Sequence, residues 1–184
     1  MLTMGFPFRR QKDAKDCGLS CLSMILKFHG VNTNIGSTFF QCDIGKNGVS
    51  LGSMRRVAEK IGFHTSCGMV SLQYLINNVK YPCILHWNQN HFVVLYKIKK
   101  ETNFFIADPA KGLIIYNLDE FKEHWLSTYL DGEDKGVAMF LEPTPAFFAN
   151  RDFDEDNKEK RSFSFLFDYI IKNKKYFSQI ILGL

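Results

Sequence analysis

The sequence predicts an α+β fold, in which an N-terminal helical lobe packs on a C-terminal antiparallel β-sheet. Apolar residues recur at helical spacing before Phe63, and short β-like runs separated by polar turns follow it. Helices followed by strands, without regular alternation, are typical of an α+β architecture. The chain has 184 residues, 46% hydrophobic and 23% charged, which is enough for one domain with its own core.

The first predicted helix begins after Asp16, whose side chain is expected to cap it, and ends at Gly30. Its apolar positions follow the helical period: Leu19, Leu22, Ile25 and Leu26. Cys17 therefore lies in the first helical turn. A short helix and a turn at "GKNG" (45–48) are expected next, and then a helix from Ser50 to Lys60.

The predicted strands are the runs "HTSCGMV", "PCILHW", "HFVVLYKI", "NFFIADP", "GLIIYN" and "GVAMFLEP". One helix is expected to interrupt them, from about Leu118 to Leu126. The composition then changes, so the domain is expected to span residues 1–148.

The segment 149–162 is predicted to be a solvated linker, because "RDFDEDNKEKRS" contains four basic and five acidic residues. Residues 163–184 are apolar but interrupted by lysines, which indicates an amphipathic interfacial helix followed by the start of a truncated transmembrane segment. An amphipathic helix docked on the domain is the alternative.

The net charge and the cysteine pattern restrict the expected binding partners and the expected cellular compartment. The net charge of +4 comes without a Lys/Arg block, so a nucleic-acid-binding surface is not expected. Five cysteines without paired C-x-x-C spacing, and no signal peptide, indicate a reducing, cytoplasmic compartment. No run of 18 apolar residues forms a complete transmembrane helix.

Cys17 is the candidate nucleophile, because the positive end of a helix dipole favours the thiolate. A buried, inert thiol is the alternative. His91 is the candidate base. If Lys99 to Thr102 form the turn of a hairpin, Ile98 faces Asn103 and Asp108 lies opposite Val93. His91 and Asp108 then share a face of the sheet within hydrogen-bonding reach.

His86 and Gln11 are two further candidates for the predicted active site. His86 is the main competitor of His91, but its strand offers no carboxylate in register. A tetrahedral intermediate also needs donors for its oxyanion, and Gln11 lies six residues before Cys17 on the loop that leads into the helix. By itself, Gln11 is better explained as an ordinary surface residue.

Four segments, "QKDAKDCGLSCLSMILKFHG", "GVSLGSMRRVAEKIGF", "HFVVLYKI" and "ADPAKG", resemble the double-glycine leader peptidase domain of bacteriocin-processing ABC transporters. The resemblance covers residues 8–145 and implies a papain-like cysteine peptidase fold. It implies that Cys17 is the nucleophile, His91 the base, Asp108 the residue that orients the base, and Gln11 the oxyanion donor.

The sequence departs from this family at two places. Ser20 replaces a small apolar residue in the Asp-Cys-Gly-x-Ala-Cys run, which is close to isosteric. "HWLST" (124–128) replaces a Trp-Thr-Gly motif, so the last strands of the domain are not defined by the resemblance.

The resemblance implies a cysteine endopeptidase that removes the leader of a bacteriocin-like peptide precursor after a Gly-Gly pair. It also implies coupling to export by an ABC transporter, homodimeric and located at the cytoplasmic face of the bacterial plasma membrane. A catalytically idle leader-binding module and a papain-like acyltransferase or amidase are the alternatives. No cofactor or metal is expected in this chain, since ATP and Mg would belong to the nucleotide-binding domain of a full transporter.

Three further motifs resemble known sites only in part. Asp152, Asp154 and Asp156 begin like a calcium loop, but Asn157 and Phe163 stand where Gly and Glu are needed. "GKNG" lacks the flanking residues of a P-loop. Cys17 and Cys21 are one helical turn apart, and packing is preferred to a redox pair for Cys21.

Overall fold

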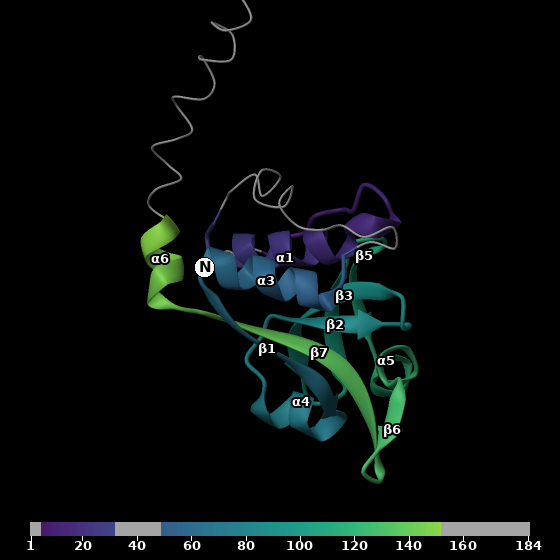
Figure 1. Cartoon of the computed structure of the whole chain (residues 1–184). Helices are drawn as coiled ribbons and strands as arrows, with labels where there is room; N and C mark the ends of the chain where they lie inside the picture. Colours follow the sequence, from purple (N-terminus) through teal and green to yellow (C-terminus); the bar gives the residue numbers. More distant parts are fainter. Residues whose placement is uncertain (1–4, 32–48, 152–184) are drawn as a thin grey trace, which may run out of the picture.

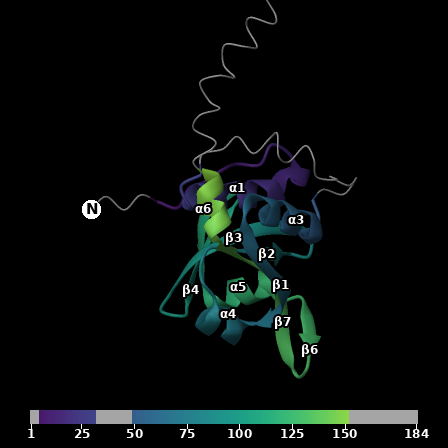
Figure 2. The ribbon, with the colours of Figure 1, turned by 60° about the vertical axis from the view of Figure 1, so that its left-hand side comes forward.

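The computed structural model describes residues 5–31 and 49–151. In this part of the chain, α1 (Cys17–Phe28) and α3 (Leu51–Ile61) cover one face of an antiparallel sheet (Figure 1). The helices α4 (Leu72–Asn78) and α5 (Leu118–Trp125) cover the other face. The turned view in Figure 2 shows the same three layers. The predicted packing of an N-terminal helical lobe on a sheet is confirmed.

The sheet has the strand order β1-β7-β2-β3-β4-β5, and β6 pairs with β7 outside this path. Its strands are β1 (Phe63–Ser71), β2 (Cys83–Trp87), β3 (His91–Lys99), β4 (Asn103–Asp108), β5 (Gly112–Tyr116), β6 (Thr128–Leu130) and β7 (Glu133–Pro143). Every pairing is antiparallel. The six predicted strands correspond to all of these except β6.

The first helix has the predicted extent, but the prediction of its N-cap is wrong. The Asp16 side chain makes no capping hydrogen bond, because its backbone is already helical at φ −89° and ψ −1°. Asp13 instead caps the 3-10 turn η1 (Ala14–Asp16) by accepting a hydrogen bond from the Lys15 N–H at 2.8 Å. Gly30 ends the helical segment at φ +82°, as expected from the freedom of glycine.

The helix predicted from Ser50 to Lys60 is confirmed as α3. The Ser50 hydroxyl oxygen accepts a hydrogen bond from the Ser53 N–H at 3.1 Å, which satisfies one free donor of the first turn. Gly62 ends the helix at φ +104°. The short helix and the "GKNG" turn predicted before it lie outside the described residues.

Four short elements of the described residues were not predicted: η1, α4, β6 and α6 (Pro145–Arg151). The expectation of a single helix among the strands is therefore wrong. The run "LQYLINN" of α4 is too short to show a helical period, and the three residues of β6 are all exposed. Helix α6 crosses the boundary predicted at residue 148, so the first three residues of the predicted linker are helical. The rest of the predicted linker and the segment 163–184 lie outside the described residues.

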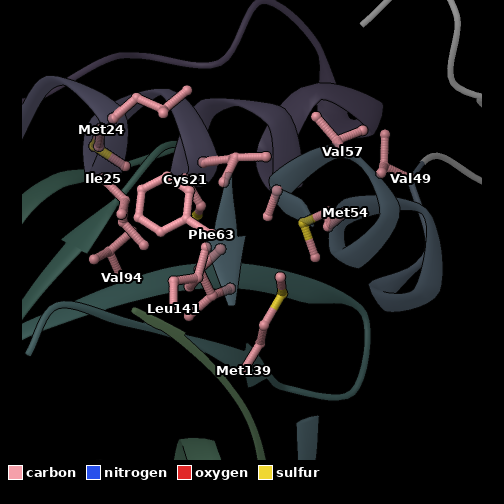
Figure 3. Close-up of a cluster of buried hydrophobic side chains, with 14 of the residues drawn as sticks. Cys21, Met24, Ile25, Val49, Met54, Val57, Phe63, Val94, Met139 and Leu141 are labelled. Carbon is pink, nitrogen blue, oxygen red and sulfur yellow. The ribbon is translucent and has the colours of Figure 1, made fainter. Parts of the chain in front are cut away.

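Each face of the sheet has its own core. Figure 3 shows the core under the N-terminal helices, where Cys21 and Ile25 of α1 and Met54 and Val57 of α3 pack towards Val94 and Met139. The opposite core contains side chains from both helices of that layer and from the two central strands: Leu75 of α4, Phe121 and Trp125 of α5, Cys83, Leu85 and Trp87 of β2, and Val93 and Leu95 of β3. A fully buried side chain of this size contributes about 1.5–3 kcal/mol, so both helical layers are anchored to the sheet.

The β3–β4 hairpin has the predicted register near the site but not near its turn. Val94 pairs with Ala107 and Leu95 with Ile106, as predicted. The ladder shifts by one residue between Leu95 and Lys97, so Ile98 faces Phe104, whereas Asn103 was expected. The inserted residue is a β-bulge, which a count from the turn cannot anticipate.

Among the helices of the described residues, none has the length and apolar character needed to cross a membrane.

Candidate active site

Cys17 is the first residue of α1 and has only 7% of its surface exposed. The sequence folds this way because the η1 turn ends at Asp16 and α1 begins at the next residue. The main chain of Gly18 in the first turn hydrogen bonds to the thiol, and the positive end of the helix dipole favours its thiolate form. The helix presents a thiol that is prepared for nucleophilic chemistry.

His91 and Asp108 meet where two neighbouring strands end. His91 is the first residue of β3 and Asp108 is the last of β4. The His91 Nε2–H donates a hydrogen bond to Asp108 Oδ1 at 2.7 Å, and the Ala110 N–H donates to the same oxygen at 2.8 Å. The predicted contact between the two side chains is confirmed. Asp108 is only 1% exposed, so its carboxylate is shielded from solvent.

The His91 side chain also forms a hydrogen bond with Cys17. Since Nε2 is held by Asp108, Nδ1 is the nitrogen left to face the thiol. The three side chains therefore form a continuous chain from carboxylate to imidazole to thiol. This arrangement orients the imidazole and assigns its tautomer, as a nucleophile with an adjacent base requires.

The electrostatics of the site favour an ion pair between Cys17 and His91. Burial by itself raises the pKa of Cys17, but the hydrogen bond to His91, main-chain hydrogen bonds at Phe92 and Gly18, and the His91 charge bring it below its ordinary value. Burial lowers the pKa of His91, yet its hydrogen bonds to Asp108 and Cys17 raise it to about 9. A thiolate beside an imidazolium is the favoured state near neutral pH.

Asp108 is ionised in this arrangement. Burial raises its pKa, but the hydrogen bonds from His91 and from the Ala110 N–H outweigh burial and hold the pKa below its usual value. The positive charge of Lys111 acts in the same direction. Asp108 is therefore available as a fixed negative charge behind the imidazole.

Cys21 has the properties of a packing residue. It is fully buried in the core below α1, and its thiol donates a hydrogen bond to the Phe92 carbonyl at 3.2 Å. Burial and the nearby charges of Cys17 and Asp108 raise its pKa well above the ordinary value. A protonated thiol held in a core is unsuited to redox chemistry, which agrees with the packing role preferred from the sequence.

Gln11 lies beside the turn that carries Asp108. Its backbone N–H donates to the Pro109 carbonyl at 3.0 Å, so the segment before α1 is fixed to the β4–β5 turn. Its side-chain Oε1 is buried and has no hydrogen-bond partner in the described structure. An oxyanion would need the side-chain NH2 group of Gln11 as its donor, and this role stays a prediction.

The competitor His86 lies in a different environment. It pairs with Phe92 across the β2–β3 ladder and lines a cavity of about 460 Å³ together with Ser50, Asn90 and Val137. Burial lowers the pKa of His86, because the half-buried ring has no counter-charge. This side chain therefore lines the cavity in its neutral form.

Two contributors were missed by the sequence reasoning, and both act through the backbone. The main chain of Phe92 hydrogen bonds to Cys17 and to Cys21, and the Ala110 N–H fixes the Asp108 carboxylate. Main-chain groups are present in every residue, so the residue types do not reveal such contacts. The only available signal was that Phe92 follows His91 and that Ala110 lies two residues after Asp108.

A comparison with protein families and with curated proteins gives consistent matches. The model of the Peptidase C39 family matches residues 5–134. The probable microcin-H47 secretion/processing ATP-binding protein of Escherichia coli is 31% identical over 78% of this chain and 19% of its own length. The lactococcin-G-processing and transport ATP-binding protein of Lactococcus lactis is 29% identical over 92% of this chain and 23% of its own. The chain thus spans about a fifth of these relatives.

Solved structures share the fold. A double glycine motif protease from an AMS/PCAT transporter, in complex with its leader peptide, is 27% identical, with a TM-score of 0.66, over 78% of this chain and 97% of the other. The peptidase domain of Streptococcus ComA is 23% identical, with a TM-score of 0.64, over 76% of this chain and 100% of the other. The predicted α+β, papain-like fold is confirmed.

Proposed function

The chain belongs to the peptidase C39 family, and from this premise we propose that it is a cysteine endopeptidase that removes a peptide leader after a Gly-Gly pair. The observation that carries the proposal is the thiol of Cys17 at a helix N-terminus, hydrogen bonded to an imidazole that Asp108 orients. The solved neighbour that is named a double glycine motif protease supports the choice of substrate.

The geometry gives each residue a step. The Cys17 thiolate attacks the carbonyl carbon of the second glycine, and the Cys17 N–H and the Gln11 side chain stabilise the oxyanion. The His91 imidazolium donates its Nδ1 proton to the leaving amine, and an acyl-enzyme remains. His91 then takes a proton from water, which attacks the thioester and regenerates the thiol. Asp108 holds the imidazole in place throughout.

The partners follow from the same premise. The curated relatives are named as processing and transport ATP-binding proteins, which supports a precursor peptide as substrate and an ABC transporter as the partner machinery. We place the domain at the cytoplasmic face of the plasma membrane, with the transporter homodimeric. The chemistry needs no cofactor in this chain, and ATP and Mg would serve the nucleotide-binding domain.

A Gly-Gly pair offers no side chains, so affinity must come from another part of the leader. An apolar strip lies beside the active site and consists of Phe6, Tyr96, Phe105, Leu113 and Ile115. Phe6 stacks on Tyr96 at 4.5 Å between ring centroids, and Tyr96 lies 5.9 Å from Phe105. Ile115 pairs with Phe105, and Leu113 is on the same face of β5.

The position of the apolar strip suits a docking site for the leader. Ile115 is 57% exposed and Leu113 47% exposed, which is unusual for large apolar residues on one face. Leu113 directly follows Gly112, the partner of Asp108, so the strip begins at the end of β5 that pairs with the end of β4 carrying Asp108. An amphipathic helix bound here by its apolar side would lead its following residues towards Cys17.

Ile115→Asp is expected to raise KM for a leader-bearing peptide about tenfold and to leave kcat within about twofold, because the lost contact is remote from the reacting bond. Steady-state kinetics with synthetic precursors measure both constants. Tyr129→Asp is the matched control, since Tyr129 is 72% exposed at the opposite end of the sheet and should have no effect. Equal effects of the two substitutions would exclude the apolar strip as the docking site.

The function itself is tested by mass spectrometry of synthetic precursors after incubation with the protein. Cleavage is expected after Gly-Gly and is expected to fall by about a hundredfold when the second glycine is replaced by Ala, since selectivity without side chains must come from exclusion of a Cβ. Binding without cleavage would indicate an idle leader-binding module. Transfer of the acyl group to an added amine in preference to water would indicate an acyltransferase.

A further inference from the structure

The turn between β2 and β3 has an unusual backbone conformation and leads directly into His91. It comprises residues 88–90, between Trp87 and His91, which face each other across the ladder. Asn88 has φ +49° and Gln89 has φ +59°, a region that residues other than glycine rarely adopt. The turn has one internal hydrogen bond, from the Asn90 N–H to the Trp87 carbonyl at 3.2 Å. His91 is the first residue after the turn, so further contacts that support the turn also fix the start of β3.

The support comes from α5. The Asn88 N–H donates to the His124 carbonyl at 2.9 Å, and His124 Nδ1 lies 2.9 Å from Asn88 Oδ1. The carbonyl of His124 is in the last turn of α5, where no helical donor is available to it. One residue of the helix therefore binds both the main chain and the side chain of the first turn residue.

The ring of His124 adds a third contact. It stacks on Trp87 with 5.2 Å between centroids and an interplanar angle of 29°. Trp87 is 1% exposed and is the strand partner of His91. His124 thus contacts the residue opposite His91 and the turn that leads to it.

We infer that His124, through its hydrogen bonds to Asn88, is a positioning residue that holds the His91 imidazole against Cys17. The inference rests on the proposed peptidase function and extends it, since it assigns a role to the "HWLST" segment (124–128). Without the hydrogen bonds between His124 and Asn88, the turn relaxes and the His91 imidazole moves away from Cys17. A displacement of about 1 Å in an active site can lower the rate up to about a hundredfold.

Two substitutions separate the hydrogen bond from the stacking. His124→Asn keeps a side-chain donor at the place of Nδ1 and removes the ring, whereas His124→Phe keeps the ring and removes the donor. Asn88→Gly is a second probe, because glycine accepts the positive φ but lacks the Oδ1 acceptor. If the hydrogen bond between the side chains of His124 and Asn88 positions His91, His124→Phe and Asn88→Gly should both impair the reactivity of Cys17. His124→Asn should behave almost like the wild type.

Two measurements on the full chain report the defect. Alkylation of Cys17 by iodoacetamide as a function of pH follows the thiolate and needs no peptide substrate. We expect its midpoint to move to higher pH in His124→Phe, because the His91 hydrogen bond and charge that lower the pKa of Cys17 are weakened. With a Gly-Gly precursor, kcat should fall about tenfold, and KM should stay within about twofold.

The controls identify a merely structural effect. Asn117→Ala removes the cap of α5 without touching the turn, so it should lower thermal stability and leave the alkylation midpoint unchanged. In a His91→Ala background, His124→Phe should have no further effect on alkylation. A wild-type alkylation profile in His124→Phe and Asn88→Gly, or equal shifts in His124→Asn and Asn117→Ala, would overturn the inference. Failure of the protein to cleave any Gly-Gly peptide would overturn the proposed function and leave the alkylation result standing.

Discussion

Cys17→Ala is expected to lower the rate of leader cleavage by about 10⁴-fold or more, because the covalent step then has no nucleophile. The remaining groups polarise the carbonyl but cannot form an acyl-enzyme. Binding of the leader should persist, since the apolar strip is untouched. Single-turnover cleavage followed by mass spectrometry measures the first effect, and titration of a labelled leader peptide measures the second.

Cys21→Ser is the matched control for this prediction. The serine hydroxyl is close in size to the thiol and can donate the same hydrogen bond to the Phe92 carbonyl. Activity is therefore expected to remain within about threefold of the wild type, with some loss of stability from the buried oxygen. Complete loss of activity in a folded Cys21→Ser protein would show that both thiols take part in the chemistry, as in a redox pair.

The fold was predictable where a local signal is strong. The helix that carries Cys17 and the strand that carries His91 were found because a helical period and β-branched runs are visible in the residues themselves. The elements α4 and β6 were missed because they are short and depend on tertiary contacts. Leu75 of α4 is fully buried between the sheet and its neighbours, which only the assembled sheet explains.

The relative placement of His91 and Asp108 was predictable from strand pairing, although one step of the argument was wrong. The count from the turn assigned Ile98 to Asn103, but the bulge after Leu95 offsets the actual turn by one residue. The side chains share a face because the pairing of Val94 with Ala107 is unaffected by the bulge. No local sequence pattern relates α1 to β3. The approach of Cys17 to His91 and Asp108 was therefore implied only by the family resemblance.

The support of the site by α5 could not be read from the sequence. A histidine in the last turn of a helix is usually explained by the helix dipole, and Asn88 by the turn in which it lies. Only the structure shows that these two residues bind each other across 36 positions of the chain. The candidate site is therefore in contact, directly or through one turn, with helices on both faces of the sheet, α1 on one face and α5 on the other.

His91→Ala is expected to lower kcat by about 10³–10⁴-fold, because both the acid that protonates the leaving amine and the base that activates water are lost. The substitution also acts on the nucleophile. It removes the hydrogen bond and the positive charge that lower the pKa of Cys17, while burial continues to raise it. Alkylation of Cys17 should therefore require a higher pH than in the wild type.

The pH profile of the wild type provides the reference. The active ion pair forms as pH rises through the lowered pKa of Cys17, and it is lost as pH rises through the His91 pKa of about 9. A bell-shaped profile with an alkaline limb near pH 9 is expected, and His91→Ala should abolish that limb. His86→Ala is the control, because that ring lines the cleft without a carboxylate partner, and its removal should preserve the bell shape. If His86→Ala abolished turnover and His91→Ala did not, the hydrogen bond between His91 and Asp108 would be structural, and the base would have to be sought in the cavity beside β2.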